Sequence, residues 1–158
     1  ILEGIEYLHS QLIAHRDIKP QNILVTKNNQ VYIMDFNVSS KSKQETFRMM
    51  TKTGTVAFSA PEIFTQQVYN EKVDIWSAGT VLYMMLCGHQ PFDNENMAQL
   101  VQQITRDEPD ITAEGFLDVS SEAIDLIEKM LNKDPEQRPS ATECLKSSWF
   151  RPTINNKL

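Results

Sequence analysis

The segment from Asp74 to Leu86 is apolar on nearly every side when it is drawn as a helix. Such a helix is stable only where other elements cover its whole circumference, so we expect it at the centre of a helical domain. Gly88 and Pro91 end it, because glycine is favoured just after a helix and proline cannot continue one. The 158 residues are enough for one domain with a core of this kind.

Further segments with helical periodicity flank the central one. In each of them the apolar residues share one face. Serine begins two of these helices, because its hydroxyl accepts hydrogen bonds from the first unpaired backbone N–H groups. The predicted helices run from Ile1 to Leu8, from Asn94 to Arg106, from a cap at Ser120 or Ser121 to a stop at Asp134-Pro135, and from Ser140 to Leu145.

A short β-hairpin is predicted before the central helix. Ile23 to Val25 and Val31 to Met34 are strand-like, and the turn-forming stretch from Thr26 to Gln30 joins them. From Phe36 to Ala60 the chain is polar and without periodicity, which is typical of a functional loop. The predicted fold class is therefore α+β, mainly α-helical, with one small hairpin.

The charge, the apolar runs and the cysteines of the chain argue against several kinds of partner and site. The net charge is −6 and the acidic residues are scattered, which argues against a nucleic-acid partner. The longest apolar run, Val81 to Cys87, is far shorter than the roughly 20 residues that cross a membrane, so we expect no membrane partner. Cys87 and Cys144 do not have the C-x-x-C spacing of a metal site, so we expect them to be buried, reduced thiols. We expect a protein of the cytoplasm, with the nucleus as the alternative.

Three short motifs follow one another in a fixed order. His15 to Asn22 reads H-R-D-I-K-P-Q-N, Asp35 to Asn37 reads D-F-N, and Ala60 to Glu62 reads A-P-E. Together they resemble the eukaryotic protein kinase family, of the serine/threonine type, whose motifs are H-R-D-x-K-x-x-N, D-F-G and A-P-E. The similarity implies that residues 1–150 are the C-terminal lobe of a kinase domain and that 151–158 are a tail. The stretch from Leu86 to Phe92 looks most like the calcium/calmodulin-dependent branch.

The resemblance implies transfer of the γ-phosphoryl group of ATP to a hydroxyl of a protein substrate, with Mg²⁺. Asp17 would be the catalytic base, and Lys19 would place a positive charge on the transferred group. Asn22 and Asp35 offer the oxygen ligands that Mg²⁺ prefers. We expect the hairpin to return the chain so that Asp35 lies opposite Asn22.

Further residues match family positions around this loop. Leu24 and Met34 would line the floor of the adenine pocket, with plain hairpin core as the alternative interpretation. Asp74 would anchor the backbone of the catalytic loop, as a supporting residue. Glu62 and Arg138 match an ion pair between segments far apart in sequence, and losing one partner of such a buried pair costs on the order of 3–5 kcal/mol.

Regulation is expected in the polar loop. Thr51 occupies the position most similar to the family's activating phosphosite, and its phosphate would meet Arg16 and order the loop after an upstream kinase has acted. The alternative is that Thr51 is an ordinary polar loop residue. Thr55 is expected to contact Asp17 and Lys19 through its hydroxyl.

Some features depart from the family pattern. Asn37 replaces the glycine of D-F-G; asparagine tolerates a left-handed backbone better than most residues, so we expect the motif still to form. Gln21 stands where many kinases of basic substrates carry glutamate, which argues against a basic consensus. His15 is expected to pack beneath the loop rather than to carry protons.

The largest departure is that this sequence has no glycine-rich loop and no strand lysine paired with a helix glutamate. We therefore expect a part of a longer enzyme, with little activity of its own and with an exposed apolar surface where the other lobe would lie. The alternative function is a pseudokinase or truncated lobe that acts as a binding scaffold. Asn37 favours that alternative, whereas the intact Asp17, Lys19, Asn22 and Asp35 argue against it. Substrate identity and oligomeric state are left open.

Overall fold

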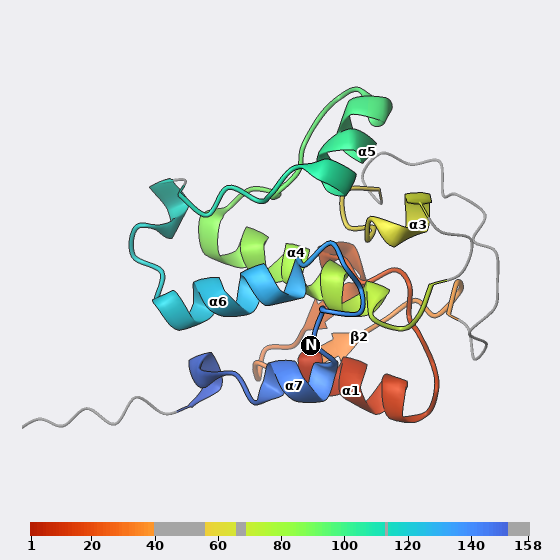
Figure 1. Ribbon diagram of the computed structural model, residues 1–158. Coiled ribbons are helices and arrows are strands. Elements are labelled where there is room, and N and C mark those ends of the chain that lie inside the picture. Colours follow the sequence, from red (N-terminus) through yellow and green to blue (C-terminus); the bar gives the residue numbers. More distant parts are fainter. Residues whose placement is uncertain (40–55, 66–68, 113, 152–158) are drawn as a thin grey trace, which may run out of the picture.

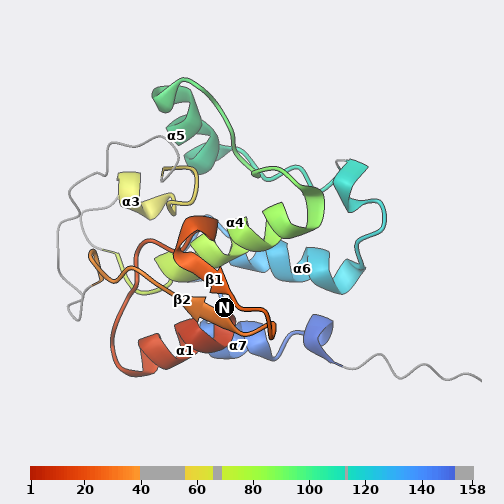
Figure 2. The same ribbon diagram turned by 180° about the vertical axis from the view of Figure 1, so that it is seen from behind.

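Helix α4, Val73–Cys87, runs through the middle of the computed structural model (Figure 1). The structure describes residues 1–39, 56–65, 69–112 and 114–151. Around α4 it has further helices and a single two-stranded antiparallel sheet within the described ranges, so the predicted mainly helical α+β class is confirmed. In both views α5 and α3 lie on one side of α4, while α1 and α7 lie side by side on the other (Figures 1 and 2).

The burial of α4 follows its composition for most of its length. Every residue from Val73 to Tyr83 is buried, as the prediction of a covered central helix requires. The prediction is wrong for the last turn, where Met85 is 70% exposed. Gly79 allows helix α6 to approach closely, because a Cβ atom there would come within 2.8 Å of the Cβ of Met130. Gly88 ends the helix with φ of 85°, a left-handed conformation that glycine adopts without strain.

The N-terminal helix is confirmed as α1, Leu2–Ser10, which buries Ile5 and Leu8. Helix α5 begins three residues later than predicted and spans Met97–Arg106. The side chain of Asn96 accepts hydrogen bonds from the N–H groups of two following residues, at 3.0 and 3.2 Å, and this cap sets the start. Among the described residues no helix is both long and apolar enough to cross a membrane.

Serine caps determine where the last two predicted helices begin. Ser120, rather than its neighbour, caps α6, Ser121–Met130. Ser140 caps α7, Ala141–Leu145, in a capping box in which the Glu143 carboxylate accepts a hydrogen bond from the Ser140 backbone N–H. The remaining short elements are the 3-10 turns Pro20–Asn22, Glu114–Phe116 and Ser148–Phe150 and the helix α3, Glu62–Thr65.

The hairpin forms where it was predicted. Strand β1, Ile23–Val25, pairs antiparallel with β2, Val31–Ile33, with Ile23 opposite Ile33. Asn29 in the turn has φ of 58°, a left-handed value that asparagine tolerates. The second strand ends one residue earlier than predicted, but the N–H of Met34 still donates to the carbonyl of Asn22 at 2.8 Å. The hairpin therefore brings the residues after β2 back to the start of β1.

Candidate active site

In the loop between α1 and the hairpin, two of the predicted site residues converge on the carboxylate of a third. Asp17 is 7% exposed. The Lys19 Nζ donates to both of its carboxylate oxygens, at 2.8 and 2.7 Å. The Asn22 Nδ2 donates to Asp17 Oδ2 and to the Asp17 backbone carbonyl, each at 2.8 Å. The Asp17 side chain is thus held from two sides in a single orientation.

The backbone of this loop is held by a buried carboxylate from the first turn of α4. Asp74 accepts hydrogen bonds from the N–H groups of His15, at 2.8 Å, and Arg16, at 2.7 Å. Arg16 has φ of 67°, a left-handed conformation that costs a non-glycine residue roughly 1–2 kcal/mol. Two hydrogen bonds to a fully buried charged group offset that cost. The predicted anchoring role of Asp74 agrees with this geometry.

His9 completes the anchor and is not among the residues predicted from the sequence. Its Nε2 donates to Asp74 Oδ2 at 3.0 Å from the last turn of α1. A lone histidine on a helix belongs to no motif, so no pattern in the sequence marked it. The contact links α1 to α4 beneath the loop.

His15 packs under the loop, as expected. Its side chain is fully buried, and the centre of its ring lies 4.9 Å from the centre of the Phe36 ring in an edge-to-face arrangement. Its Nδ1 accepts from the N–H of Asp17 at 3.3 Å, so the proton lies on Nε2, which donates to the Met34 carbonyl at 3.0 Å. Both ring nitrogens are engaged in joining the loop to the end of the hairpin.

Asp35 follows the hairpin directly and is exposed. Because the N–H of Met34 donates to the carbonyl of Asn22, Met34 lies opposite Asn22, and Asp35, which was predicted there, follows one residue later. The comparison with D-F-G suggested a left-handed backbone at Asn37. The structure has it at Asp35 instead, with φ of 65°. Asn37 instead donates its N–H to Asp35 Oδ1 at 3.3 Å. The Gly-to-Asn departure therefore places no left-handed strain on residue 37.

Leu24 and Met34 are 46% and 40% exposed, so the interpretation of both as plain hairpin core is wrong. They belong to an exposed apolar surface on the hairpin, which was expected from the sequence. Their predicted place in an adenine pocket stays a prediction. The other large apolar residues of this surface are Val25, Val31, Tyr32 and Phe36.

The predicted ion pair is present and buried. Arg138 donates from Nη1 and Nη2 to the two carboxylate oxygens of Glu62, at 2.6 and 2.9 Å, and each residue is 1% exposed. The guanidinium also donates to the carbonyls of Lys72 and Asn132, at 2.9 to 3.1 Å. The pair joins α3 to the loop between α6 and α7, and every guanidinium nitrogen is satisfied.

A protein kinase domain matches residues 1–150 of the chain. The chain belongs to the protein kinase family. Its similarity to curated relatives extends over almost its whole length, at 37% identity over 98% of this chain for "Probable serine/threonine-protein kinase fhkE" of Dictyostelium discoideum. It is 38% identical over 95% to a "Serine/threonine-protein kinase H1 homolog" of Pinctada fucata, and 34% identical over 96% to "Calcium/calmodulin-dependent protein kinase cmkA" of Emericella nidulans. The chain spans 23% of the length of the first relative and 37% of each of the other two.

Asn22 and Asp35 of this kinase chain are the residues expected to hold Mg²⁺, an ion that prefers oxygen ligands. Since Asn22 Nδ2 donates to Asp17, the Oδ1 atom of that amide is turned away from Asp17 and accepts no hydrogen bond within the described part. The exposed Asp35 carboxylate adds a charged oxygen ligand. The ranges that the structure describes hold no cluster of three or more His, Cys, Asp or Glu side chains suited to a metal. An amide and a carboxylate, completed by phosphate and water oxygens, fit Mg²⁺.

The predicted regulatory residues are placed only in part. Thr51 and Thr55 lie outside the described residues, so their roles stay predictions. The guanidinium of Arg16 lies 5.4 Å from the centre of the Tyr69 ring. Gln21 is exposed in the short turn that precedes β1.

Proposed function

We propose that this chain supplies the catalytic loop of a serine/threonine protein kinase that transfers the γ-phosphoryl group of ATP to a hydroxyl of a protein substrate. The observation that carries the proposal is the convergence of Lys19 and Asn22 on the Asp17 carboxylate, at 2.7–2.8 Å. Membership of the family supports it. Because the chain spans only 23% and 37% of the lengths of two of these relatives, the activity is assigned to the longer enzyme.

Each residue of the cluster has a distinct task in this proposal. The Asp17 carboxylate accepts the proton of the substrate hydroxyl as that oxygen attacks. Asn22 fixes the orientation of the carboxylate through Nδ2, so little reorganisation is needed during the reaction. The Lys19 ammonium lies next to the same carboxylate and places a positive charge where the transferred phosphoryl group carries negative charge.

Asn22 Oδ1 and the Asp35 carboxylate would hold Mg²⁺. The ion supplies neutralisation of the phosphate oxygens of ATP. The exposed faces of Leu24 and Met34 support an adenine pocket, because an apolar surface next to the catalytic loop suits a flat aromatic base.

The proposal includes activation by an upstream kinase. Phosphate on Thr51 would pair with Arg16, whose backbone is already bound to Asp74. A Thr51→Ala variant of the longer enzyme is expected to lose most of its activity, and a Thr51→Glu variant to keep part of it. Unchanged activity in Thr51→Ala would remove this part of the proposal and leave the catalytic part standing.

The decisive experiment is an ATP-dependent phosphorylation assay of the full-length gene product and its Asp17→Ala variant. Loss of the base should lower kcat by roughly 10²–10⁴-fold, because general-base catalysis contributes that much. Asp118→Ala is the matched control, since Asp118 is exposed on a different part of the chain, and it should leave kcat unchanged. Equal activity in the Asp17 variant would refute the assignment of the base.

The competing function is a binding scaffold. The exposed apolar surface of the hairpin favours it, because such surfaces commonly mark protein contacts. If the intact protein transfers no phosphate even when Thr51 is phosphorylated, the scaffold replaces the kinase as the proposed function.

A further inference from the structure

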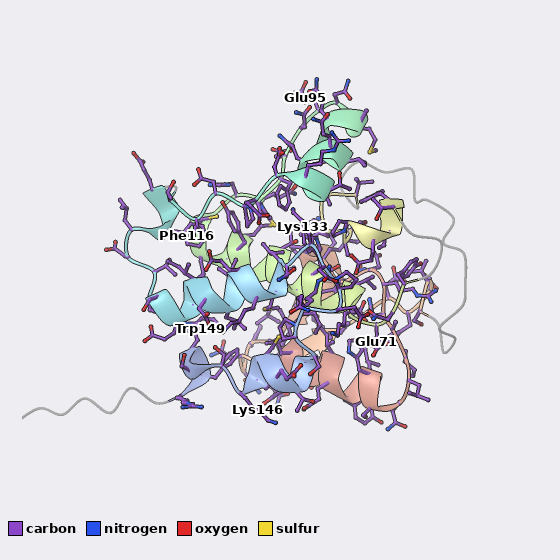
Figure 3. All side chains as sticks on the ribbon, in the orientation of Figure 1. Glu71, Glu95, Phe116, Lys133, Lys146 and Trp149 are labelled. Atoms are coloured by element: carbon purple, nitrogen blue, oxygen red, sulfur yellow. The ribbon has the colours of Figure 1, made fainter. Side chains whose placement is uncertain are left out.

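Lys133 lies between helix α5 and the body of the molecule (Figure 3). Its Nζ donates to the carbonyl of Ile104 at 2.9 Å. Ile104 belongs to the last turn of α5, where the carbonyls lack the N–H donors of a continuing helix; of these, only that of Gln103 accepts from the next backbone N–H, of Asp107, within the described residues. A cation at this end also interacts favourably with the helix dipole. Lys133 therefore caps the C-terminal end of α5 from another part of the fold.

The same ammonium group contacts two stacked aromatic rings. Trp76 and Phe92 are nearly parallel, at 9°, with ring centres 6.0 Å apart. The Lys133 Nζ lies 4.8 Å from the centre of the Trp76 ring and 4.2 Å from that of Phe92. Both rings are buried, and cation–π contacts of this kind favour the charged amine. The positive charge on Lys133 thus helps to attach α5 to the core.

Charges of both signs surround Lys133, but none of the described carboxylates is a close counter-ion. Within the part of the chain that the structure describes, no carboxylate oxygen lies within 4.0 Å of its Nζ. Burial lowers the pKa of Lys133 to about 8, whereas Glu108 and Asp107 at the end of α5 act to raise it and Arg138 to lower it. At about pH 8 roughly half of such amines are neutral, against well under 1% of exposed lysines with a pKa of about 10.4.

We propose that Lys133 is an acylation site, modified by activated acyl donors such as acyl thioesters, and that its acylation releases the last turn of α5 from the core. Several properties support the site. Lys133 is partly exposed, in the loop between α6 and α7. Its positive charge interacts with both the C-terminal end of α5 and the two rings, so modification of the amine removes both interactions.

The chemical step is balanced without any further reactant. The lone pair of the neutral Nζ attacks the thioester carbonyl carbon, a C–N bond forms, and the C–S bond breaks. The thiolate leaves and takes up the proton that the amine nitrogen loses. The product is an uncharged amide with one N–H and added bulk. It has no cation to offer to the rings of Trp76 and Phe92 or to the end of α5.

The first experiment measures the reactivity of the site in the 158-residue chain. N-hydroxysuccinimidyl acetate is added in trace amounts from about pH 7 to about pH 10, together with the free standard Nα-acetyl-lysine amide. Mass spectrometry gives the ratio of labelling at Lys133 to labelling of the standard, which cancels hydrolysis of the reagent. The ratio should be constant below about pH 8 and then fall about tenfold per pH unit, because Lys133 is already neutral while the standard is still losing protons. A ratio that stays constant over the whole range, or no label on Lys133, would overturn the proposal.

The second experiment measures the consequence by amide hydrogen exchange. The Lys133→Gln variant mimics the uncharged amide, and Lys133→Arg keeps the charge. Exchange in the last turn of α5 should become about five- to tenfold faster in the Gln variant and in acetylated protein, and should stay within about twofold in the Arg variant. Lys129→Gln is the matched control, because Lys129 is exposed and paired with Asp125 on α6. Equal exchange in the Gln and Arg variants would overturn the release of α5.

Discussion

Replacement of Arg138 by methionine tests how much the buried ion pair contributes to folding. The change removes the guanidinium that bonds both Glu62 oxygens and leaves that carboxylate 1% exposed without its cation. Removing one partner of a buried pair costs about 3–5 kcal/mol. The carbonyls of Lys72 and Asn132 also lose their donors, which adds to the same cost. We expect a loss of about 4 kcal/mol in the free energy of unfolding.

Urea unfolding followed by far-UV circular dichroism measures this loss. With an m-value of about 2 kcal/mol/M, a loss of about 4 kcal/mol lowers the midpoint by about 2 M. The exposed pair of Lys129 and Asp125 is the matched control, since its atoms are 2.7 Å apart but its side chains are 62% and 51% exposed. Lys129→Met should cost only about 0.3–0.5 kcal/mol.

A second substitution separates the cost of the unpaired carboxylate from the cost of the unpaired carbonyls. The double variant Arg138→Met with Glu62→Met no longer buries a lone carboxylate, so it should be about 1–2 kcal/mol more stable than Arg138→Met alone. The unpaired carbonyls keep it less stable than the wild-type protein. The reasoning is refuted if Arg138→Met costs no more than Lys129→Met, or if the double variant is no more stable than the single one.

Three further outcomes are expected. Asp74→Asn weakens the anchor of the catalytic loop, so the His15 amide should exchange about tenfold faster or more, as read by hydrogen exchange. Burial raises the pKa of Cys144 to about 12. Near pH 8 an aromatic disulfide reagent should therefore modify Cys87 alone in the folded chain and both thiols in urea. Rapid labelling of Cys144 in the folded chain would contradict this. Ser140→Ala removes a capping box and should lower stability by about 1 kcal/mol in urea unfolding; an unchanged midpoint would show that the cap contributes nothing.

Much of the local structure could be predicted from the sequence. The capping box of Ser140 with Glu143 joins residues three apart, and the register of the hairpin follows from two short strands and one turn. The order and spacing of the motifs also placed Asp17, Lys19 and Asn22 in one loop. These features depend on neighbours in the chain, so periodicity, turn residues and motif spacing carry them.

Other features of the site depend on how distant segments pack. Asp74 and the loop backbone are 58 and 59 residues apart, and only the resemblance to the kinase family, not a local pattern, indicated that they meet. The left-handed backbone falls on Asp35 and not on Asn37, which the motif comparison did not predict. In the sequence Lys133 is an ordinary charged residue. Only the structure shows that its ammonium contacts rings from two other segments. The sequence by itself determined the elements, the motifs and the family. The family resemblance indicated the Asp74 anchor and the pair of Glu62 with Arg138, but only the tertiary structure decided their geometry and the contacts of His9 and Lys133, because burial and hydrogen bonding between distant segments are set by the docking of whole elements.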